Sequence, residues 1–177
     1  MGVGGRPGST ETPLTARSTV ELDAGDSSDG LPPLQGLWTP RLLNPEAPRA
    51  SQPHLGVLIV VGGTSAGVAG PCRRGHRVTD RQLGLFNALA AVLPQSGVSV
   101  LQFSYRVKGW HGVEQSRHDM NAALRWVTAQ LADEEASVPI GLIGHSMGGL
   151  LTARFAQANP DAVAGIGILG ALIGDWN

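Results

Sequence analysis

Ser146 is the residue of this sequence whose neighbours best suit chemistry at a hydroxyl group. It stands at the centre of Gly144-His145-Ser146-Met147-Gly148, which fits the pattern G-x-S-x-G. In that pattern the serine adopts a strained backbone conformation at a sharp turn between a strand and a helix. The flanking glycines are a steric demand, because the two backbones nearly touch and a Cβ atom would collide. The pattern therefore predicts a nucleophile elbow with Ser146 as the nucleophile.

The residues around Ser146 supply the strand and the helix that such a turn requires. Residues 138–143 are apolar and β-branched enough for a buried parallel strand. Apolar residues at helical spacing follow the serine until Asn159-Pro160 ends the helix. The free N–H groups and the positive dipole end of that helix favour negative charge beside the serine. We expect the N–H of Met147 to form one half of an oxyanion hole.

A second stretch, Gly63-Thr64-Ser65-Ala66-Gly67, fits the same pattern after an apolar run at 55–61. The residues that follow it, VAGPCRRG, contain glycines and a proline that oppose the immediate helix an elbow requires. We therefore place the nucleophile at Ser146 and not at Ser65. This glycine-rich loop also lacks both nucleotide-binding patterns, G-x-G-x-x-G and Gly-Lys-Ser/Thr.

A basic cluster follows this loop and consists of Arg73, Arg74, His76, Arg77 and Arg81. Runs of charge are usually solvated, so we interpret the cluster as a solvated loop and not as a clamp for an acidic substrate. Cys72 lies among these arginines and has no identifiable partner for a nucleophilic role.

Composition excludes several classes of function. The 177 residues include 42% hydrophobic residues and carry a formal net charge of −1, which is typical of one globular domain and argues against a nucleic-acid surface. One cysteine and five scattered histidines build no disulfide framework and no metal site. The first thirty residues contain no apolar stretch of signal-peptide length, and no uninterrupted apolar span reaches about 18 residues anywhere in the sequence. We therefore expect a cytoplasmic protein without a cofactor, a metal ion or a membrane span.

Hydrophobic periodicity and turn residues predict the remaining elements. Residues 1–16 are rich in Gly, Pro, Ser and Thr and are expected to form a disordered tail before a domain at 17–177. The expected strands are 18–22, 34–38, 55–61, 98–103, 138–143 and 163–172, and the expected helices are 79–93, 113–131 and the one after Ser146. An antiparallel pair followed by alternating strands and helices implies an α/β protein with a mostly parallel, doubly wound sheet.

Several details of these elements are open to a structural check. Thr79 or Asp80 is expected to cap the first helix. In the second helix an apolar stripe faces the core, so Asp119 and Arg125 are expected to face outward. The last strand, 163–172, is apolar enough to be buried, but in residues 1–177 alone it is expected to be left as an exposed edge strand.

These residues and their order resemble the α/β-hydrolases. The resemblance covers about 18–177, and GHSMGG is similar to the motif of the esterase, lipase and serine-aminopeptidase branch. It implies a serine hydrolase of carboxylic ester, thioester or peptide bonds, with Ser146 as the nucleophile and Met147 as an oxyanion donor. It also implies a second donor from the loop after strand 55–61, where Gly63 and Thr64 are the alternatives.

The acid and the base are missing from their usual places. In this family they follow the serine in chain order, with the histidine last. No histidine follows Ser146, and Asp175 is the candidate acid, although a turn residue explains it better. Of the upstream histidines, only His76 and His111 lie on loops that leave the carboxyl ends of strands, where such sites form.

Two interpretations of this departure remain. The first is a serine hydrolase whose sheet lacks its last strands here, as the N-terminal portion of a longer chain or as an incomplete gene model. The second is a non-catalytic module of the same fold that binds a ligand or a partner. In either case residues 1–177 alone are expected to be inactive as a hydrolase.

Overall fold

The computed structural model describes residues 17–23, 31–41, 55–62, 77–107, 113–132 and 137–171. Several residues named above lie outside these ranges: the expected tail at 1–16, Gly63, Thr64, Ser65, Cys72, Arg73, Arg74, His76, His111 and Asp175. The expectations attached to them stay predictions.

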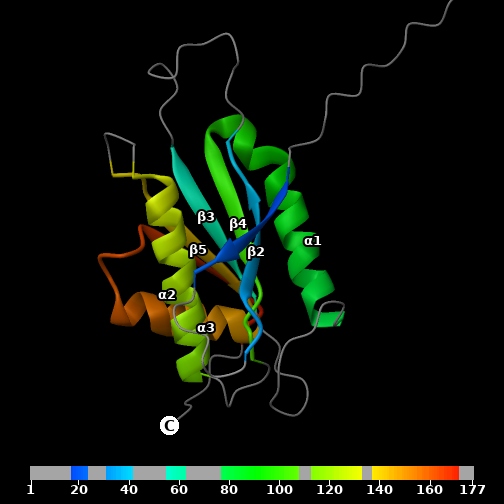
Figure 1. Cartoon of the computed structure of the whole chain (residues 1–177), viewed down its shortest axis with the longest axis vertical. Coiled ribbons are helices and arrows are strands. Elements are labelled where there is room, and N and C mark those ends of the chain that lie inside the picture. Colours follow the sequence, from blue (N-terminus) through cyan, green and yellow to red (C-terminus); the bar gives the residue numbers. More distant parts are fainter. Residues whose placement is uncertain are drawn as a thin grey trace, which may run out of the picture.

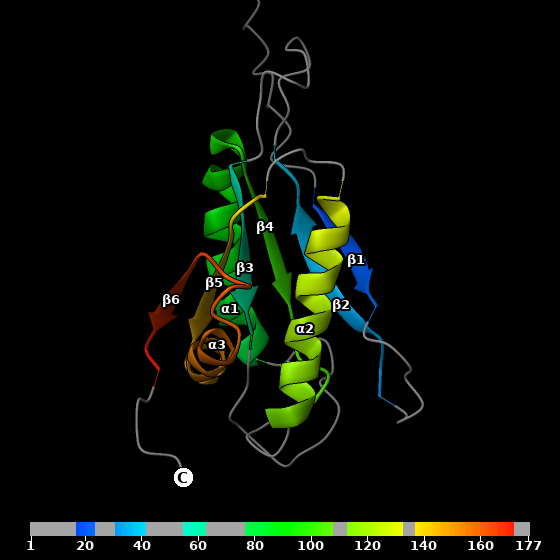
Figure 2. The ribbon, with the colours of Figure 1, turned by 90° about the vertical axis from the view of Figure 1, so that its left-hand side faces the viewer.

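A six-stranded sheet forms the centre of the described part of the chain (Figure 1). Its strands are β1 (Ser18–Leu22), β2 (Leu34–Thr39), β3 (Gly56–Val61), β4 (Val98–Phe103), β5 (Ile140–His145) and β6 (Gly165–Leu169). They lie in the order β1-β2-β4-β3-β5-β6, so β1 and β6 are the two outer strands (Figure 2). β2 pairs antiparallel with β1 and β4, and the other neighbours pair in parallel. The predicted antiparallel pair and mostly parallel sheet are confirmed.

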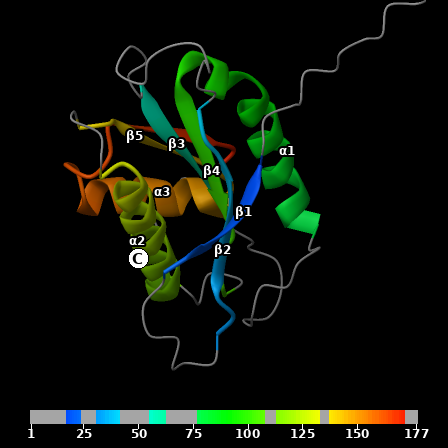
Figure 3. The ribbon, with the colours of Figure 1, turned by 45° about the horizontal axis from the view of Figure 1, so that its top comes forward.

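Among the described residues, three α-helices cover the two faces of the sheet. α1 (Arg77–Val92) packs on one face, and α2 (Val113–Gln130) and α3 (Met147–Ala158) pack on the other (Figures 1 and 3). A short 3-10 helix, η2 (Leu93–Ser96), connects α1 to β4. Parallel strands need long crossovers, and the connection from each of β3, β4 and β5 contains one of these helices. The sheet is therefore doubly wound, as predicted.

Two apolar layers fill the space between the sheet and the helices. The larger layer contains Met120 and Val127 of α2 and Met147, Leu151 and Phe155 of α3. On the other face, Phe86 and Ala90 of α1 pack on Val60 and Val100. Ile59 and Val61 belong to the first layer, whereas Val60 belongs to the second. This alternation explains why β3 is apolar at every position, since both of its faces are covered.

Some predicted boundaries are wrong. α1 begins at Arg77, so neither Thr79 nor Asp80 is its cap. β5 begins at Ile140 and not at 138, because Pro139 has no N–H for a sheet ladder.

The last strand is shorter than expected, and it lies at the edge of the described sheet, as predicted for residues 1–177. β6 covers only Gly165–Leu169, and Ile166 and Leu169 are 46% and 42% exposed. In the described sheet β6 has a neighbour on one side only, so its apolar side chains are not covered.

Asp119 was expected to face outward, but it is completely buried on α2. Arg125 is exposed, as expected. The neighbours of Asp119 on the same helical face, Ser116 and Ala123, are also buried. Their small side chains leave room for the carboxylate and its partner.

None of the described helices combines the length and the apolar character that a membrane crossing requires.

Candidate active site

The carboxyl ends of β4, β3 and β5 finish side by side. Val61 of β3 is in register with Phe103 of β4 on one side and with Gly144 of β5 on the other. Neighbouring strands are about 4.8 Å apart, so the axes of β4 and β5, which have β3 between them, are about 10 Å apart. The segment after β4, which begins at Ser104, therefore starts close to the turn at Ser146.

Ser146 lies in a strained turn between β5 and α3. Its backbone angles are φ 56° and ψ −123°, and no other described non-glycine residue has a positive φ. A residue with a Cβ atom held in such a region costs about 1–3 kcal/mol, and such strain clusters at functional sites. The Ser146 N–H donates to the carbonyl of Leu169 at 2.9 Å, and its carbonyl accepts from the Gly149 N–H at 3.0 Å. β6 and α3 together thus hold this conformation.

Gly144 and Gly148 allow the strand and the helix to meet at this turn. A Cβ atom on Gly144 would collide with the Gly148 carbonyl and would lie 2.6 Å from Thr152 Oγ1. A Cβ atom on Gly148 would lie 2.5 Å from the carbonyl oxygen of Val61. The steric demand predicted for these two glycines is therefore confirmed. The Val61 contact also places the end of β3 against the first turn of α3.

The Ser146 side chain is partly exposed and makes no capping hydrogen bond to α3. Its hydroxyl is therefore not engaged in capping the helix. The first N–H groups of an α-helix have no carbonyl acceptor one turn earlier, and the helix dipole adds positive potential there. An anion next to Ser146 would therefore be stabilised by the start of α3.

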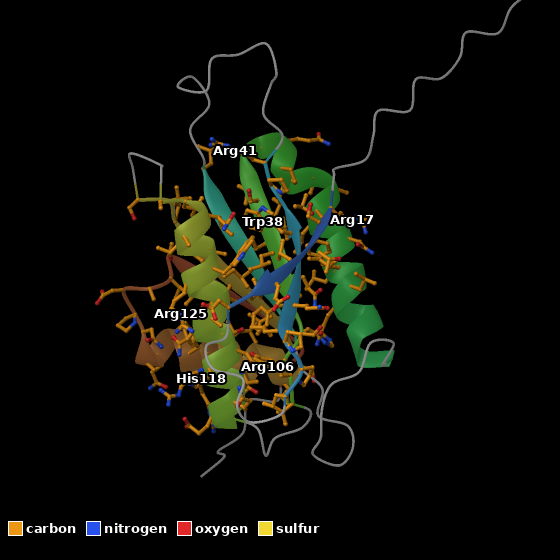
Figure 4. The ribbon with its side chains drawn as sticks, viewed as in Figure 1. Arg17, Trp38, Arg41, Arg106, His118 and Arg125 are labelled. Carbon is orange, nitrogen blue, oxygen red and sulfur yellow. The ribbon has the colours of Figure 1, made fainter. Side chains whose placement is uncertain are left out.

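His118 and His145 are the histidines within the described residues, and neither was a candidate for the base. His118 is exposed on α2 (Figure 4). The His145 ring lies beside Gly170, where its Nε2 would be 3.7 Å from an added Cβ atom. The loop candidates His76 and His111 and the candidate acid Asp175 lie outside the described residues. Within those residues, no three His, Cys, Asp or Glu side chains gather as a metal site.

Sequence reasoning missed a buried ion pair just beyond the end of β4. Asp119 accepts two hydrogen bonds of 2.8 Å from Arg106, one from the main-chain N–H and one from Nε. The two side chains are 4% and 0% exposed. Gln115 Nε2 donates a third hydrogen bond to the carboxylate at 3.2 Å. The signal in the sequence was the small residues one turn away from Asp119 on α2, which mark a face close to the sheet.

Tyr105 lies next to this pair in the chain and is almost fully buried. Its ring packs edge-on against Phe103, with 5.3 Å between the ring centroids. Its hydroxyl is buried without a hydrogen-bond partner. Burial raises the pKa of Tyr105 well above its ordinary value, and the negative charge of Asp119 adds to this effect. Tyr105 is therefore a neutral phenol at physiological pH.

A groove of about 1120 Å³ lies at the opposite end of the sheet from Ser146. Its lining comes from the C-terminal half of α2 and from 137–140 and 161–164. These last two segments lead into β5 and β6, whereas Ser146 follows β5. The groove is therefore separate from the Ser146 turn and is not part of this candidate site.

Comparison with known proteins relates more than half of the chain to one family. The family model described as serine aminopeptidase, S33, matches residues 77–177. Among curated proteins, no sequence matches the chain significantly.

Solved structures of α/β-hydrolases share the fold of this chain. An α/β serine hydrolase without a lid from Xanthomonas campestris is 19% identical with a TM-score of 0.58, and the match covers 91% of this chain and 64% of that one. A thermostable carboxyl esterase from Bacillus coagulans is 16% identical with a TM-score of 0.56, over 86% and 44%. A dienelactone hydrolase from Anabaena variabilis is 17% identical with a TM-score of 0.57, over 89% and 64%. The chain thus spans less than two thirds of each of these proteins.

Proposed function

The chain belongs to the serine aminopeptidase S33 family, and we propose that it is the nucleophile-bearing part of a serine hydrolase. The bonds cleaved would be carboxylic ester, thioester or peptide bonds of small molecules. The observation that carries the proposal is the backbone of Ser146, which is strained between β5 and α3 with φ 56°. A strand-to-helix turn of this kind is the geometry of a nucleophile elbow, which presents the serine hydroxyl at the top of the sheet.

In the proposed reaction, Ser146 Oγ attacks the carbonyl carbon of the substrate and its proton passes to a base. Negative charge then develops on the carbonyl oxygen of the tetrahedral intermediate. The N–H of Met147 at the start of α3 would donate to this oxyanion, together with an N–H from Gly63 or Thr64. Support for the second donor comes from Gly62, whose carbonyl oxygen is 2.7 Å from an added Gly148 Cβ atom. The loop that contains Gly63 and Thr64 therefore begins beside α3.

The base and the acid are the incomplete part of the proposal. A serine hydroxyl is a weak nucleophile at neutral pH without a base, and general-base assistance contributes about 10²–10⁴ in rate. His76 and His111 are the loop histidines that we consider for this role, and Asp175 is the candidate acid. The family order instead places both groups after the serine, where this sequence has no histidine.

Carboxylic esters are the first substrates to test, because the solved structures of this fold include a protein named as a carboxyl esterase. The same fold includes a dienelactone hydrolase, whose substrate by name is a cyclic ester. Turnover of short p-nitrophenyl esters is therefore the starting assay for the protein in its natural length.

A fluorophosphonate probe tests the nucleophile directly. We expect labelling of the wild-type protein at Ser146, identified by peptide mapping, and complete loss of labelling in Ser146→Ala. Ser65→Ala is the matched control, because Ser65 fits the same sequence pattern but is followed by glycines and a proline. Labelling that survives Ser146→Ala would overturn the proposal. A folded protein that binds an ester analogue without any labelling would instead support the non-catalytic module.

A further inference from the structure

The end of β3 is one of the structures that hold the strained turn at Ser146. A strained backbone persists only where the surrounding structure fixes it from several sides. Two backbone hydrogen bonds fix Ser146 from β6 and from within α3. On a third side, the carbonyl oxygens of Val61 and Gly62 lie 2.5 and 2.7 Å from the position that a Cβ atom on Gly148 would occupy. The end of β3 therefore packs directly on the first turn of α3, two residues after the serine.

Gly62 is in turn contacted by Gln82 of α1. The Oε1 atom of Gln82 lies 2.6 Å from the position of a Cβ atom on Gly62, and the carbonyl oxygen of Phe103 lies 2.9 Å from it. Gln82 is 3% exposed, and Gly62 is also buried. The helices α1 and α3 pack on opposite faces of the sheet (Figure 3). The tip of Gln82 is therefore separated from the first turn of α3 by the backbone of one residue.

Gln82 belongs to a row of buried residues on α1 that is otherwise apolar. Phe86 and Ala90 follow it at one and two helical turns and pack in the second apolar layer. An amide in this row loses its hydration, so its burial requires a specific contact. Gly62 leaves the space for that contact, because a side chain on this residue would occupy the position that the tip of Gln82 reaches. Gln82 and Gly62 are therefore matched in shape at the carboxyl end of β3.

We propose that Gln82 is a positioning residue for the reaction at Ser146, because its side chain holds Gly62 against the first turn of α3. The contact acts through the length and volume of the side chain, which keep Gly62 from moving toward α1. The same turn of α3 carries the N–H of Met147, the proposed oxyanion donor. The inference rests on the proposed function, since the position of this turn matters for catalysis only if Ser146 reacts.

The first test is Gln82→Ala in the protein at its natural length. We expect kcat for a p-nitrophenyl ester to fall about 10-fold, because a displacement of about 1 Å in the reacting groups can cost up to about 10²-fold. KM should stay within about twofold, since the lost support acts on the transition state and not on substrate binding. The rate constant for fluorophosphonate labelling of Ser146 should fall by a similar factor. A merely structural role would lower the melting temperature and leave kcat of the folded enzyme unchanged.

Two further variants separate positioning from stability. Gln82→Met keeps an unbranched side chain of nearly the same length and should retain kcat within about threefold. Ala90→Gly is the matched control for stability, because Ala90 is 1% exposed on the same face of α1, two turns away from Gln82. It should lower the melting temperature through its poor helix propensity and leave kcat unchanged. All assays are run well below the lowest melting temperature of the set.

Three results would overturn the inference: an unchanged kcat in Gln82→Ala, equal losses of kcat in Gln82→Ala and Gln82→Met, or an equal loss in Ala90→Gly. The last result would show a general effect of α1 packing and not a contact of Gln82. Failure of the proposed function itself is seen separately, as fluorophosphonate labelling that survives Ser146→Ala or as a wild-type protein that is never labelled.

Discussion

Ser146 takes its unusual backbone angles because the chain passes from β5 into α3 at this single residue. Glycines on both sides let β5, α3 and the end of β3 approach more closely than a Cβ atom would permit. Strain at the serine and missing side chains at Gly144 and Gly148 are therefore parts of one geometry. Single-atom changes at these positions test it.

Gly148→Ala is expected to lower the free energy of unfolding by about 1–3 kcal/mol, because its Cβ atom would lie 2.5 Å from the Val61 carbonyl oxygen. This loss should exceed the gain of about 1 kcal/mol in helix propensity. Gly84→Ala in α1 is the matched control, since an added Cβ atom there has nothing within 4 Å. It should raise stability by about 0.5–1 kcal/mol. Urea unfolding of both variants measures the difference, and equal effects would argue against the close contact.

Tyr105 gives a prediction about alkaline pH, because it is the single tyrosine of the sequence and its pKa is raised in the folded protein. An unfolded tyrosine loses its proton near pH 10, whereas folded Tyr105 keeps it to higher pH. Its contribution to stability is therefore complete below about pH 10 and is lost as pH rises from there through the folded pKa.

Tyr105→Phe should remove this part of the alkaline loss. At neutral pH the variant should be as stable as the wild type or more stable, because the buried hydroxyl has no hydrogen-bond partner. Urea unfolding at about pH 8 and about pH 11 compares the two proteins. If the free energy of unfolding falls equally between the two pH values in the wild type and the variant, the raised pKa of Tyr105 is contradicted.

At the scale of elements, β6 contributes to the site and is also the exposed edge of the described sheet. The carbonyl of Leu169 holds the N–H of Ser146, while the side chain of Leu169 is 42% exposed. Exposed apolar edge strands are templates for pairing with another chain. The stability of the Ser146 turn therefore depends on a strand that, in the described sheet, has a neighbouring strand on one side only.

We expect residues 1–177 to self-associate through this edge. Ile166→Lys and Leu169→Lys should shift the segment toward monomer, because a charge on an exposed edge opposes strand pairing. Val92→Lys is the control, since Val92 is 57% exposed at the end of α1 and away from β6. Analytical ultracentrifugation at matched concentrations measures the change. A wild-type segment that is already monomeric would show that β6 is not an association site.

At the scale of the whole molecule, the chain matches 64% of the Xanthomonas protein and 44% of the Bacillus esterase. Those proteins therefore have structure that this chain does not match. In the chain order typical of α/β-hydrolases, the catalytic acid and histidine follow the serine. This sequence has no histidine after Ser146. The described part holds the proposed nucleophile, Ser146.

We therefore expect residues 1–177 by themselves to turn over short p-nitrophenyl esters at least about 10²-fold more slowly than a longer chain that supplies the base. They should also melt without a sharp transition, because several apolar side chains would stay exposed to solvent. Burial of each such side chain would otherwise contribute about 1.5–3 kcal/mol to the free energy of unfolding. Calorimetry and ester turnover test both points. A monomer with a sharp transition and Ser146-dependent turnover would refute this expectation and would assign the base to His76 or His111.

Local signals in the sequence were sufficient to predict the elements around Ser146. Glycines at 144 and 148 report backbone contact within a few residues, and the apolar periodicity of β5 and α3 is visible in short windows. The order of strands and helices followed from the same periodicity. Boundaries shifted by about two residues at α1 and β5, because propensity is weak evidence for where an element starts.

Tertiary structure decided what depends on residues far apart in the chain. Asp119 is polar in a helix and was expected at the surface, yet Arg106, thirteen residues earlier, gives it a buried partner. Pairing of β3 with both β4 and β5 brings the end of β4 close to the turn at Ser146, although the two are about forty residues apart in the chain. The exposure of β6 reflects its place at the edge of the sheet and not its apolar composition. Composition determines which residues can be buried, but only contacts across the fold determine which of them are.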